Sequence, residues 1–222
     1  GLLTFVLSDL DLYAGYQGMG VQLTGGSLSI ATITANKTPA TEVKDKRSWT
    51  ALSAAIGSAG LVGIDRVSAT LSDLSLQINQ ASGKYDPNVN VSGDELKAQA
   101  LDWTTALDLN ADGVFGDVLN PGALLPTPVD LTVSLTGPLL QVSGRLAELN
   151  VYDVLVGSAQ FALSTQTVDV KLSASETISG AGLLTFVLSD LDLYAGYQGM
   201  GVQLTGGSLS IATITANKTP AT

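Results

Sequence analysis

The amino-acid sequence predicts an all-β fold that is elongated, built of mainly antiparallel strands, and has at most one short helix. Apolar and polar residues alternate with a period of two, as at Leu3, Phe5 and Leu7, and this is the periodicity of a half-buried strand. Charged residues make up only 14% of the chain and hydrophobic residues 45%, whereas a helical bundle needs many Glu, Lys and Arg. The 24 glycines suit the turns that join strands. A β-sandwich and an open, solenoid-like meander both fit these observations.

The chain ends with a copy of its own beginning. Residues 1–41 reappear unchanged as residues 182–222. A self-match at a fixed offset is the mark of a repeat array. We therefore expect residues 1–181 to form one full period. Residues 182–222 then start the next period and complete a fold that a single period leaves with unpaired strand edges. A recent natural duplication and a deliberate extension of the chain by this segment explain the identity equally well.

Strands are expected within residues 2–12 and 21–30, and each has a break in its alternation. The first changes phase after Ser8, and the second is interrupted at Gly25 and Gly26. A change of phase at small residues predicts a β-bulge or a tight turn. An echo of the first segment predicts three related β-units or a chance likeness: it runs VLSDLDL at residues 6–12, TLSDLSL at 70–76 and RLAELNV at 145–151.

Prolines, Asx residues and charged residues mark the irregular parts of the chain. Residues 36–48, 83–95 and 110–128 concentrate them and are expected as long surface loops. Residues 130–136, DLTVSLT, carry the cleanest alternation in the chain and are expected as a strand, which a Gly-Pro pair ends.

One helix is expected. Ser92 and Glu95 form a capping-box pattern, and apolar residues follow at helical spacing. The pattern predicts a short helical turn after Ser92, although residues 101–109 also alternate well enough for a strand. The apolar residues at helical spacing are Leu96, Ala100, Trp103 and Leu107.

Composition removes several classes of chemistry. The chain has no cysteine and no histidine, so it lacks a thiol site, a disulfide, the commonest general base and the commonest transition-metal ligand. Neither a nucleophile paired with a base nor a phosphate-binding glycine loop is recognisable, and we expect no enzymatic activity. No apolar run reaches the roughly 18 residues that cross a bilayer, so we expect no membrane insertion.

The chain is acidic, with 10 basic and 20 acidic residues. The repeated arm has one Lys and two Asp, so one period holds 9 basic and 18 acidic residues and has a net charge of −9. Tandem copies would repel one another, stay soluble and avoid nucleic acid. An acidic surface also attracts divalent cations, and simple solubility explains the charge equally well.

The sharpest candidate site is DLNADGVFGD, residues 108–117. Alternate oxygen-bearing side chains followed by glycine wrap a backbone around a hard cation such as Ca²⁺. Leu119 stands where an EF-hand-type loop has its bidentate carboxylate, and an earlier Asp takes its place. The segment is therefore a calcium loop or an Asn/Asp/Gly turn. The candidate ligands are Asp108, Asn110, Asp112, Val114 and Asp117.

Two weaker acidic groups have simpler alternatives. Asp9 and Asp11 lie two residues apart on an expected strand, as do their copies Asp190 and Asp192. The two carboxylates of each pair either share a cation or lie on an exposed face of the strand. The other group offers oxygens along an extended segment as a second possible calcium site, or forms an Asx-rich loop leading into the capped helix. It consists of Asp86, Asn88, Asn90 and Asp94.

Aromatic residues are the remaining candidates for binding. Tyr and Trp side chains stack on sugars, and they also pack between strands. Both roles stay open for Tyr13, Tyr16, Trp49 and Trp103.

Residues 50–79 and 129–163, and above all TGPLLQVSGRL at residues 136–146, resemble the long tandem repeats of giant bacterial surface proteins. Those proteins are commonly described as adhesin-like or hemolysin-type calcium-binding chains. The nonapeptide GGxGxDxUx of calcium-binding β-rolls is absent here. The resemblance implies a secreted or cell-surface location and an extender or adhesive role.

The expected function is therefore that of a structural extender repeat, which holds a distal binding domain away from the cell. Its partners would be neighbouring identical repeats, head to tail, and a surface ligand bound through other domains. The alternative is a β-module that itself binds a polysaccharide or another surface ligand.

Overall fold

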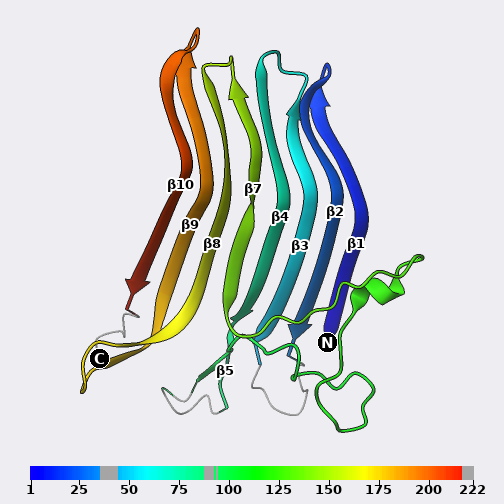
Figure 1. Cartoon of the computed structure of the whole chain (residues 1–222). Coiled ribbons are helices and arrows are strands. Elements are labelled where there is room, and N and C mark those ends of the chain that lie inside the picture. Colours follow the sequence, from blue (N-terminus) through cyan, green and yellow to red (C-terminus); the bar gives the residue numbers. More distant parts are fainter. Residues whose placement is uncertain (36–44, 88–92, 94, 217–222) are drawn as a thin grey trace. The chain divides into compact units, whose positions relative to one another are not determined.

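The computed structural model describes residues 1–35, 45–87, 93 and 95–216 (Figure 1). It confirms the all-β prediction, because 66% of the chain is strand and one antiparallel sheet of eight strands dominates. This sheet is not closed. Of the two architectures that the sequence leaves open, the structure thus has the open sheet. The helical content of the described residues is a single 3₁₀ turn, Pro121–Leu124.

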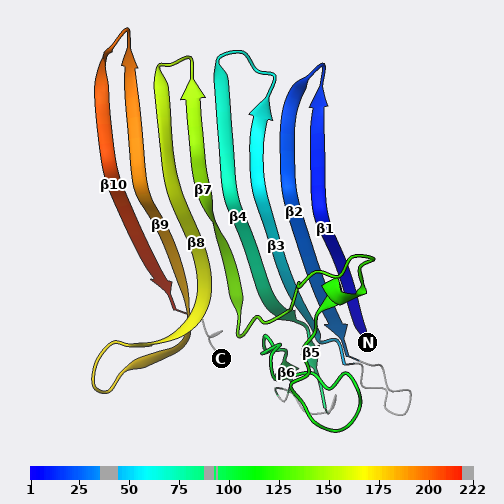
Figure 2. The same ribbon diagram turned by 45° about the vertical axis from the view of Figure 1, so that its right-hand side comes forward.

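The strands of the large sheet are neighbours in the order β1-β2-β3-β4-β7-β8-β9-β10, so each pairs with the next large strand along the chain (Figures 1 and 2). A small second sheet pairs β5 (Lys84–Tyr85) with β6 (Leu96–Lys97). The large strands are β1 (Leu2–Tyr16), β2 (Met19–Thr34), β3 (Ser48–Val62), β4 (Val67–Ser82), β7 (Leu139–Val151), β8 (Leu155–Lys171), β9 (Thr177–Tyr197) and β10 (Met200–Thr215).

The chain divides into two compact units. The first unit contains Gly1–Ser8, Leu28–Ala54 and Gln77–Leu139. The second unit contains Asp9–Ser27, Ala55–Leu76 and Leu140–Thr222. The boundary therefore passes through strands β1 to β4, and each of them contributes to both units.

Short turns in the second unit join β1 to β2, β3 to β4, β7 to β8 and β9 to β10. The β1–β2 hairpin turns at Gln17 and Gly18, whose φ angles are 52° and 81°. Two successive left-handed residues make a type I′ turn, whose twist matches that of the flanking strands. The repeated sequence forms the same turn between β9 and β10, with φ angles of 51° at Gln198 and 79° at Gly199. The turn is thus determined by its local residues in both copies.

The predicted bulges are present in the echoed motif. Asp9, Asp73 and Asp190 occupy the same motif position and have φ angles of 52°, 53° and 49°. The register of β9 against β8 shifts beside Asp190, as expected for one extra residue on β9. The third echo, residues 145–151, lies wholly in the described chain and has no left-handed residue. Within one period, the motif therefore marks a left-handed aspartate at two of its three occurrences, residues 6–12 and 70–76.

A carboxylate stabilises the break in β2. Oδ1 of Asp11 accepts the N–H of Gly25 at 3.0 Å, and Gly25 has a φ of 66°, which glycine adopts without strain. In the second copy Asp192 accepts the N–H of Gly206 at the same 3.0 Å, with φ 67°. In each copy, the aspartate on the first strand of the hairpin therefore accepts a backbone hydrogen bond from the second strand.

The first unit holds the hydrophobic core. Residues 99–138, here called the covering segment, leave the sheet and pack against β2 and β3 (Figure 2). The side-chain amide of Asn79 on β4 anchors this segment, since it donates to the carbonyls of Leu101 and Gly137, both at 2.7 Å. The core consists of Ala31 and Ala51 from the strands and Trp103, Leu107, Leu119, Val133 and Leu135 from the covering segment.

The helix expected after Ser92 is wrong for the described residues that follow it. Leu96 lies in β6, and Trp103 and Leu107 lie in irregular chain. The carbonyl of Asp102 accepts two bonds of helical type there, from the N–H of Thr105 at 3.3 Å and from that of Ala106 at 3.0 Å, which together make a single turn. Trp103 and Leu107 are both buried in the core, so the apolar spacing correctly indicated burial. It did not indicate a helix, since both residues lie in irregular chain.

The strand expected at residues 130–136 is also wrong. This stretch pairs with neither sheet. It is tied to the rest of the covering segment, since the N–H of Val133 donates to Leu119 at 2.9 Å and the carbonyl of Leu135 accepts from Trp103 at 3.0 Å. Its alternation reflects Val133 and Leu135 facing the core.

The three expected loops are described to different extents. The loop at residues 110–128 is irregular apart from the 3₁₀ turn. Most of the loop expected at residues 36–48, and part of the one expected at 83–95, lies outside the described residues.

Candidate functional site

The Asp108–Asp117 loop is organised by its own side-chain oxygens. Oδ2 of Asp108 accepts the N–H of Gly113 at 3.0 Å, Oδ1 of Asn110 accepts that of Asp112 at 2.9 Å, and Oδ1 of Asp112 accepts that of Val114 at 2.8 Å. These bonds wrap the backbone around the start of the loop. They are the bonds of the Asn/Asp/Gly turn that the sequence offers as the alternative to a calcium site.

Asp117 closes the loop from its other end. Its Oδ2 accepts the N–H groups of Leu109 at 2.7 Å and Asn110 at 3.3 Å. The N–H of Asp117 donates to the carbonyl of Leu107, a core residue, at 2.9 Å. The loop is thus fastened to the core at one point while its tip, with Val114 at 66% exposure, faces solvent.

One oxygen of the loop has no partner. Oδ1 of Asp108 is buried and accepts no hydrogen bond, and it is the one such side-chain atom among the described residues. A buried acceptor without a donor is costly, so this oxygen is suited to a cation. The described residues contain no group of three or more Asp, Glu, His or Cys side chains placed to hold a metal ion. The structure therefore brings the candidate ligands into one loop without clustering their carboxylates.

The second calcium candidate falls largely outside the described part of the chain. Asp86 follows β5. Asn88, Asn90 and Asp94 lie outside the described residues.

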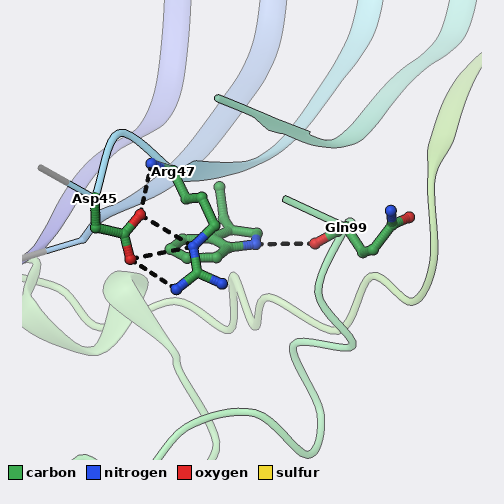
Figure 3. Close-up of polar contacts among 4 residues, drawn as sticks. Asp45, Arg47 and Gln99 are labelled. Atoms are coloured by element: carbon green, nitrogen blue, oxygen red, sulfur yellow. Dashed lines mark hydrogen bonds and ion pairs between the residues drawn. The ribbon is translucent and has the colours of Figure 1, made fainter. Parts of the chain in front are cut away.

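Arg47 forms an ion-pair and aromatic cluster that the sequence analysis missed (Figure 3). Its guanidinium bonds both carboxylate oxygens of Asp45, at 2.6 to 3.1 Å, and lies 5.6 Å from the ring centroid of Trp49 and 5.2 Å from that of Tyr85. The indole N–H of Trp49 donates to the carbonyl of Gln99 at 2.9 Å. This cluster joins the start of β3 to β5 and to the covering segment, all within the first unit.

The charges of the cluster stabilise each other. The hydrogen bonds from Arg47 lower the pKa of the Asp45 carboxyl, and the same contact raises the pKa of Arg47. Alternation of Asp45, Arg47 and Trp49 in the sequence is the signal that could have revealed the cluster, because residues two apart in extended chain share a face.

The aromatic candidates separate by burial. Trp103 is fully buried in the core and Trp49 packs against it, so both have a packing role. Tyr13 is 49% exposed and Tyr16 is 75% exposed, and they remain available to a ligand.

A shallow groove crosses β4, β7, β8 and β9 in the second unit. Its lining combines Phe161 with polar side chains, and a Cβ at Gly144 would come within 3.1 Å of the Phe161 ring. The amide of Gln160 donates to Asp190 at 2.6 Å. Other lining residues are Asp73, Arg145, Val187 and Ser189. An aromatic ring among hydrogen-bonding groups is the general chemistry of a sugar subsite.

The chain matches no protein-family profile, and no curated protein or solved structure is detectably similar to it. Within the described residues no helix has the length and apolar character needed to cross a membrane.

Proposed function

We propose that the chain is an extender repeat of a large bacterial cell-surface adhesin, in which tandem copies of the period 1–181 hold a distal binding domain away from the cell. The observation that carries the proposal is the position of the second copy. β9 and β10, which repeat β1 and β2, continue the sheet of the first period beyond β8. The partner of each period is then the next identical period, joined strand to strand.

The junction between the copies is a regular strand pair. β9 pairs antiparallel with β8 from Leu155 opposite Ala195 to Lys171 opposite Thr177. The hydroxyls of Ser164 and Thr185 bond across it at 2.6 Å. The register is interrupted at bulges but the pairing spans both strands, so a new period would be held by the same ladder as strands within a period.

The periodicity sets a length for each added repeat. One period contributes the six strands β1, β2, β3, β4, β7 and β8 to the sheet. At about 4.8 Å between strands, each period would lengthen the sheet by about 29 Å along the hydrogen-bonding direction. A net charge of −9 on each period keeps such an array soluble and discourages it from folding back on itself, which suits an extracellular stalk.

The test is to measure length against repeat number. Chains with one, two and three whole periods before the final segment, residues 182–222, are compared by small-angle X-ray scattering. We expect the maximum dimension to rise in equal steps. A dimension that levels off as periods are added would contradict the extender role.

We also propose that Ca²⁺ binds the Asp108–Asp117 loop and makes it rigid. The unpartnered, buried Oδ1 of Asp108 supports this proposal, because it offers an oxygen ligand in the same loop as Asn110 and Asp112. The remaining ligand oxygens would have to turn from backbone N–H groups toward the ion.

The second candidate function is binding of a polysaccharide or similar surface ligand. The groove with Phe161 and Arg145 favours it, as does the exposed Tyr16, which an array would present once in each period. Glycan-array binding by the 222-residue chain tests it, and loss of any such binding in Phe161→Ala would assign it to the groove.

A further inference from the structure

The same sequence has two different environments in this molecule. Ser29 and Ala31 of β2 are buried, at 3% and 0% exposure. Their copies Ser210 and Ala212 in β10 are exposed. Since the sequences are identical, the difference comes only from what lies next to each strand.

Two neighbours account for the burial of β2. β3 pairs along its edge and contributes Ala51 to the core that holds Ala31. The covering segment supplies Trp103 and other core residues, and the hydroxyl of Ser29 donates to the carbonyl of Leu131 at 3.4 Å. β2 is thus completed by residues 48–139 of its own period.

β10 has neither neighbour in the described part of the chain. It ends the sheet, so one row of its backbone N–H and C=O groups is unpaired. The apolar side chains Leu209, Ile211 and Ile214 are 46%, 47% and 52% exposed, whereas their copies in β2 are at least partly buried. This is an uncovered apolar strand whose completed form is visible in the same molecule.

We propose that the edge and apolar side chains of β10 are a docking surface for a second copy of residues 48–139. The inference rests on the proposed tandem array and names the occupant of its free end. The second β3 would pair with β10, and the second covering segment would enclose Ser210 and Ala212. The next period would then contain the same hydrophobic core as the first, with its alanine supplied by β10 and the other core residues by its own β3 and covering segment.

The occupant must lack a hairpin of its own. In the 222-residue chain β3 already pairs with β2, so a second such chain offers no free β3. The next period of an array meets this condition, because its opening segment, the copy of residues 1–41, is β9 and β10 themselves. The docking is therefore specific to the covalent continuation of the chain.

Cysteine accessibility tests the proposal in a chain that has no natural cysteine. Ser29→Cys and Ser210→Cys are matched, near-isosteric variants at the same position of the two copies. In the 222-residue chain, Cys at position 210 is expected to react with a maleimide about 100-fold faster than Cys at position 29. In the full chain lengthened by one whole period, Cys at position 210 should react with the maleimide as slowly as Cys at position 29. A cysteine at the equivalent position of the new terminal copy should still react fast.

A second variant checks that a core forms and not only a strand pair. Ile214→Lys should change the melting temperature of the 222-residue chain by less than about 2 °C, because Ile214 is 52% exposed there. In the lengthened chain it should lower the melting temperature clearly, as Ile33→Lys does in both chains, because Ile33 packs against the core. Position 210 still reacting fast in the lengthened chain, or Ile214→Lys still having no effect there, would overturn the proposal. The maximum dimension could still rise in equal steps while Cys at position 210 reacts fast with the maleimide. That result would overturn the docking proposal and keep the extender role, with the periods folding separately.

Discussion

The indole N–H of Trp103 donates to Oδ1 of Asn79 at 3.0 Å, and both side chains are buried, at 0% and 1% exposure. Asn79 lies on β4 and Trp103 in the covering segment. With its two donors on the carbonyls of Leu101 and Gly137, the Asn79 amide makes three hydrogen bonds to irregular chain. The Asn79 side chain thus makes three of the hydrogen bonds that connect the sheet to the covering segment.

Replacing Asn79 by Leu should lower the free energy of unfolding by about 3–5 kcal/mol, because one buried N–H and two buried carbonyls lose their partner. Chemical denaturation gives the measurement. Trp49→Phe is the matched control, since it removes one indole bond at a partly exposed site and should cost only about 1 kcal/mol. Equal losses in the two variants would contradict the special position of Asn79.

Acid should destabilise the first unit through Asp45. Its pKa is lowered in the folded state by the hydrogen bonds from Arg47, so the unfolded chain binds the proton more readily. The stabilisation is fully present above the ordinary pKa of about 4 and disappears as the pH falls through the lowered folded value. Asp45→Asn should therefore be less stable than the native chain at pH 7 and approach it in stability at low pH.

The acid response has a second source that serves as a control. The pKa of Asp102 is lowered by the hydroxyl and the N–H of Thr104. Asp45→Asn should thus keep part of the acid sensitivity, and the double variant with Asp102→Asn should keep less. Denaturation curves between pH 2 and pH 7 distinguish these outcomes, and an unchanged pH profile in Asp45→Asn would refute the assignment.

The bulge contact offers an internal comparison between copies. Asp11→Ala removes the acceptor for Gly25, and Asp192→Ala removes the same acceptor for Gly206. Each contact is exposed, so each loss should cost about 1 kcal/mol. Because β2 is paired on both edges and β10 on one, amide exchange near Gly206 should rise more than near Gly25. Because the two copies have the same sequence, their NMR signals are distinguished by labelling one segment of the chain at a time.

Removal of residues 182–222 should expose the edge of β8. In the longer chain this edge is covered by β9, which from Leu183 to Tyr197 has the sequence of β1. The free β1 edge of another molecule therefore matches it, and residues 1–181 should associate head to tail. We expect oligomers in light scattering and a melting temperature lower by roughly 5 °C or more. A compact monomer as heat-resistant as the longer chain would remove the basis for the array.

Calcium should raise the melting temperature of the native chain and not that of Asp108→Asn. At a Ca²⁺ concentration about 100 times the dissociation constant, binding contributes about 2.7 kcal/mol, or roughly 5 °C. Differential scanning calorimetry with Ca²⁺ and with a chelator provides the comparison. The same melting temperature in both solutions would leave the loop as an Asn/Asp/Gly turn.

The sequence predicted the strands within residues 2–12 and 21–30 correctly because their signals are local. Alternation, the phase change after Ser8 and the interruption at Gly25 report which face each side chain takes and where the ladder slips. The type I′ turn at Gln17 and Gly18 is likewise determined by adjacent residues, since it recurs unchanged in the second copy.

The covering segment was predicted less well because its signals are tertiary. Trp103 and Leu107 have helical spacing, and Val133 and Leu135 have strand spacing, yet all four only report contact with one core. The Arg47 cluster needs Tyr85 and Gln99, which are distant in sequence and meet it only in the folded chain. Hydrogen bonds from the backbone to Asp108 and Asp117 could not be inferred from the loop composition, which fits an ion equally well.

The pairing of β9 with β8 has a consequence for inheritance. In the proposed array, the segment from residue 182 meets the neighbour that the same sequence would meet in any later copy, because every later copy would follow an identical β8. Unequal recombination that inserts or deletes whole periods would then leave every strand beside the partner it had before. Gene length, and with it the length of the proposed array, could drift in steps of one period within a population without any residue having to adapt.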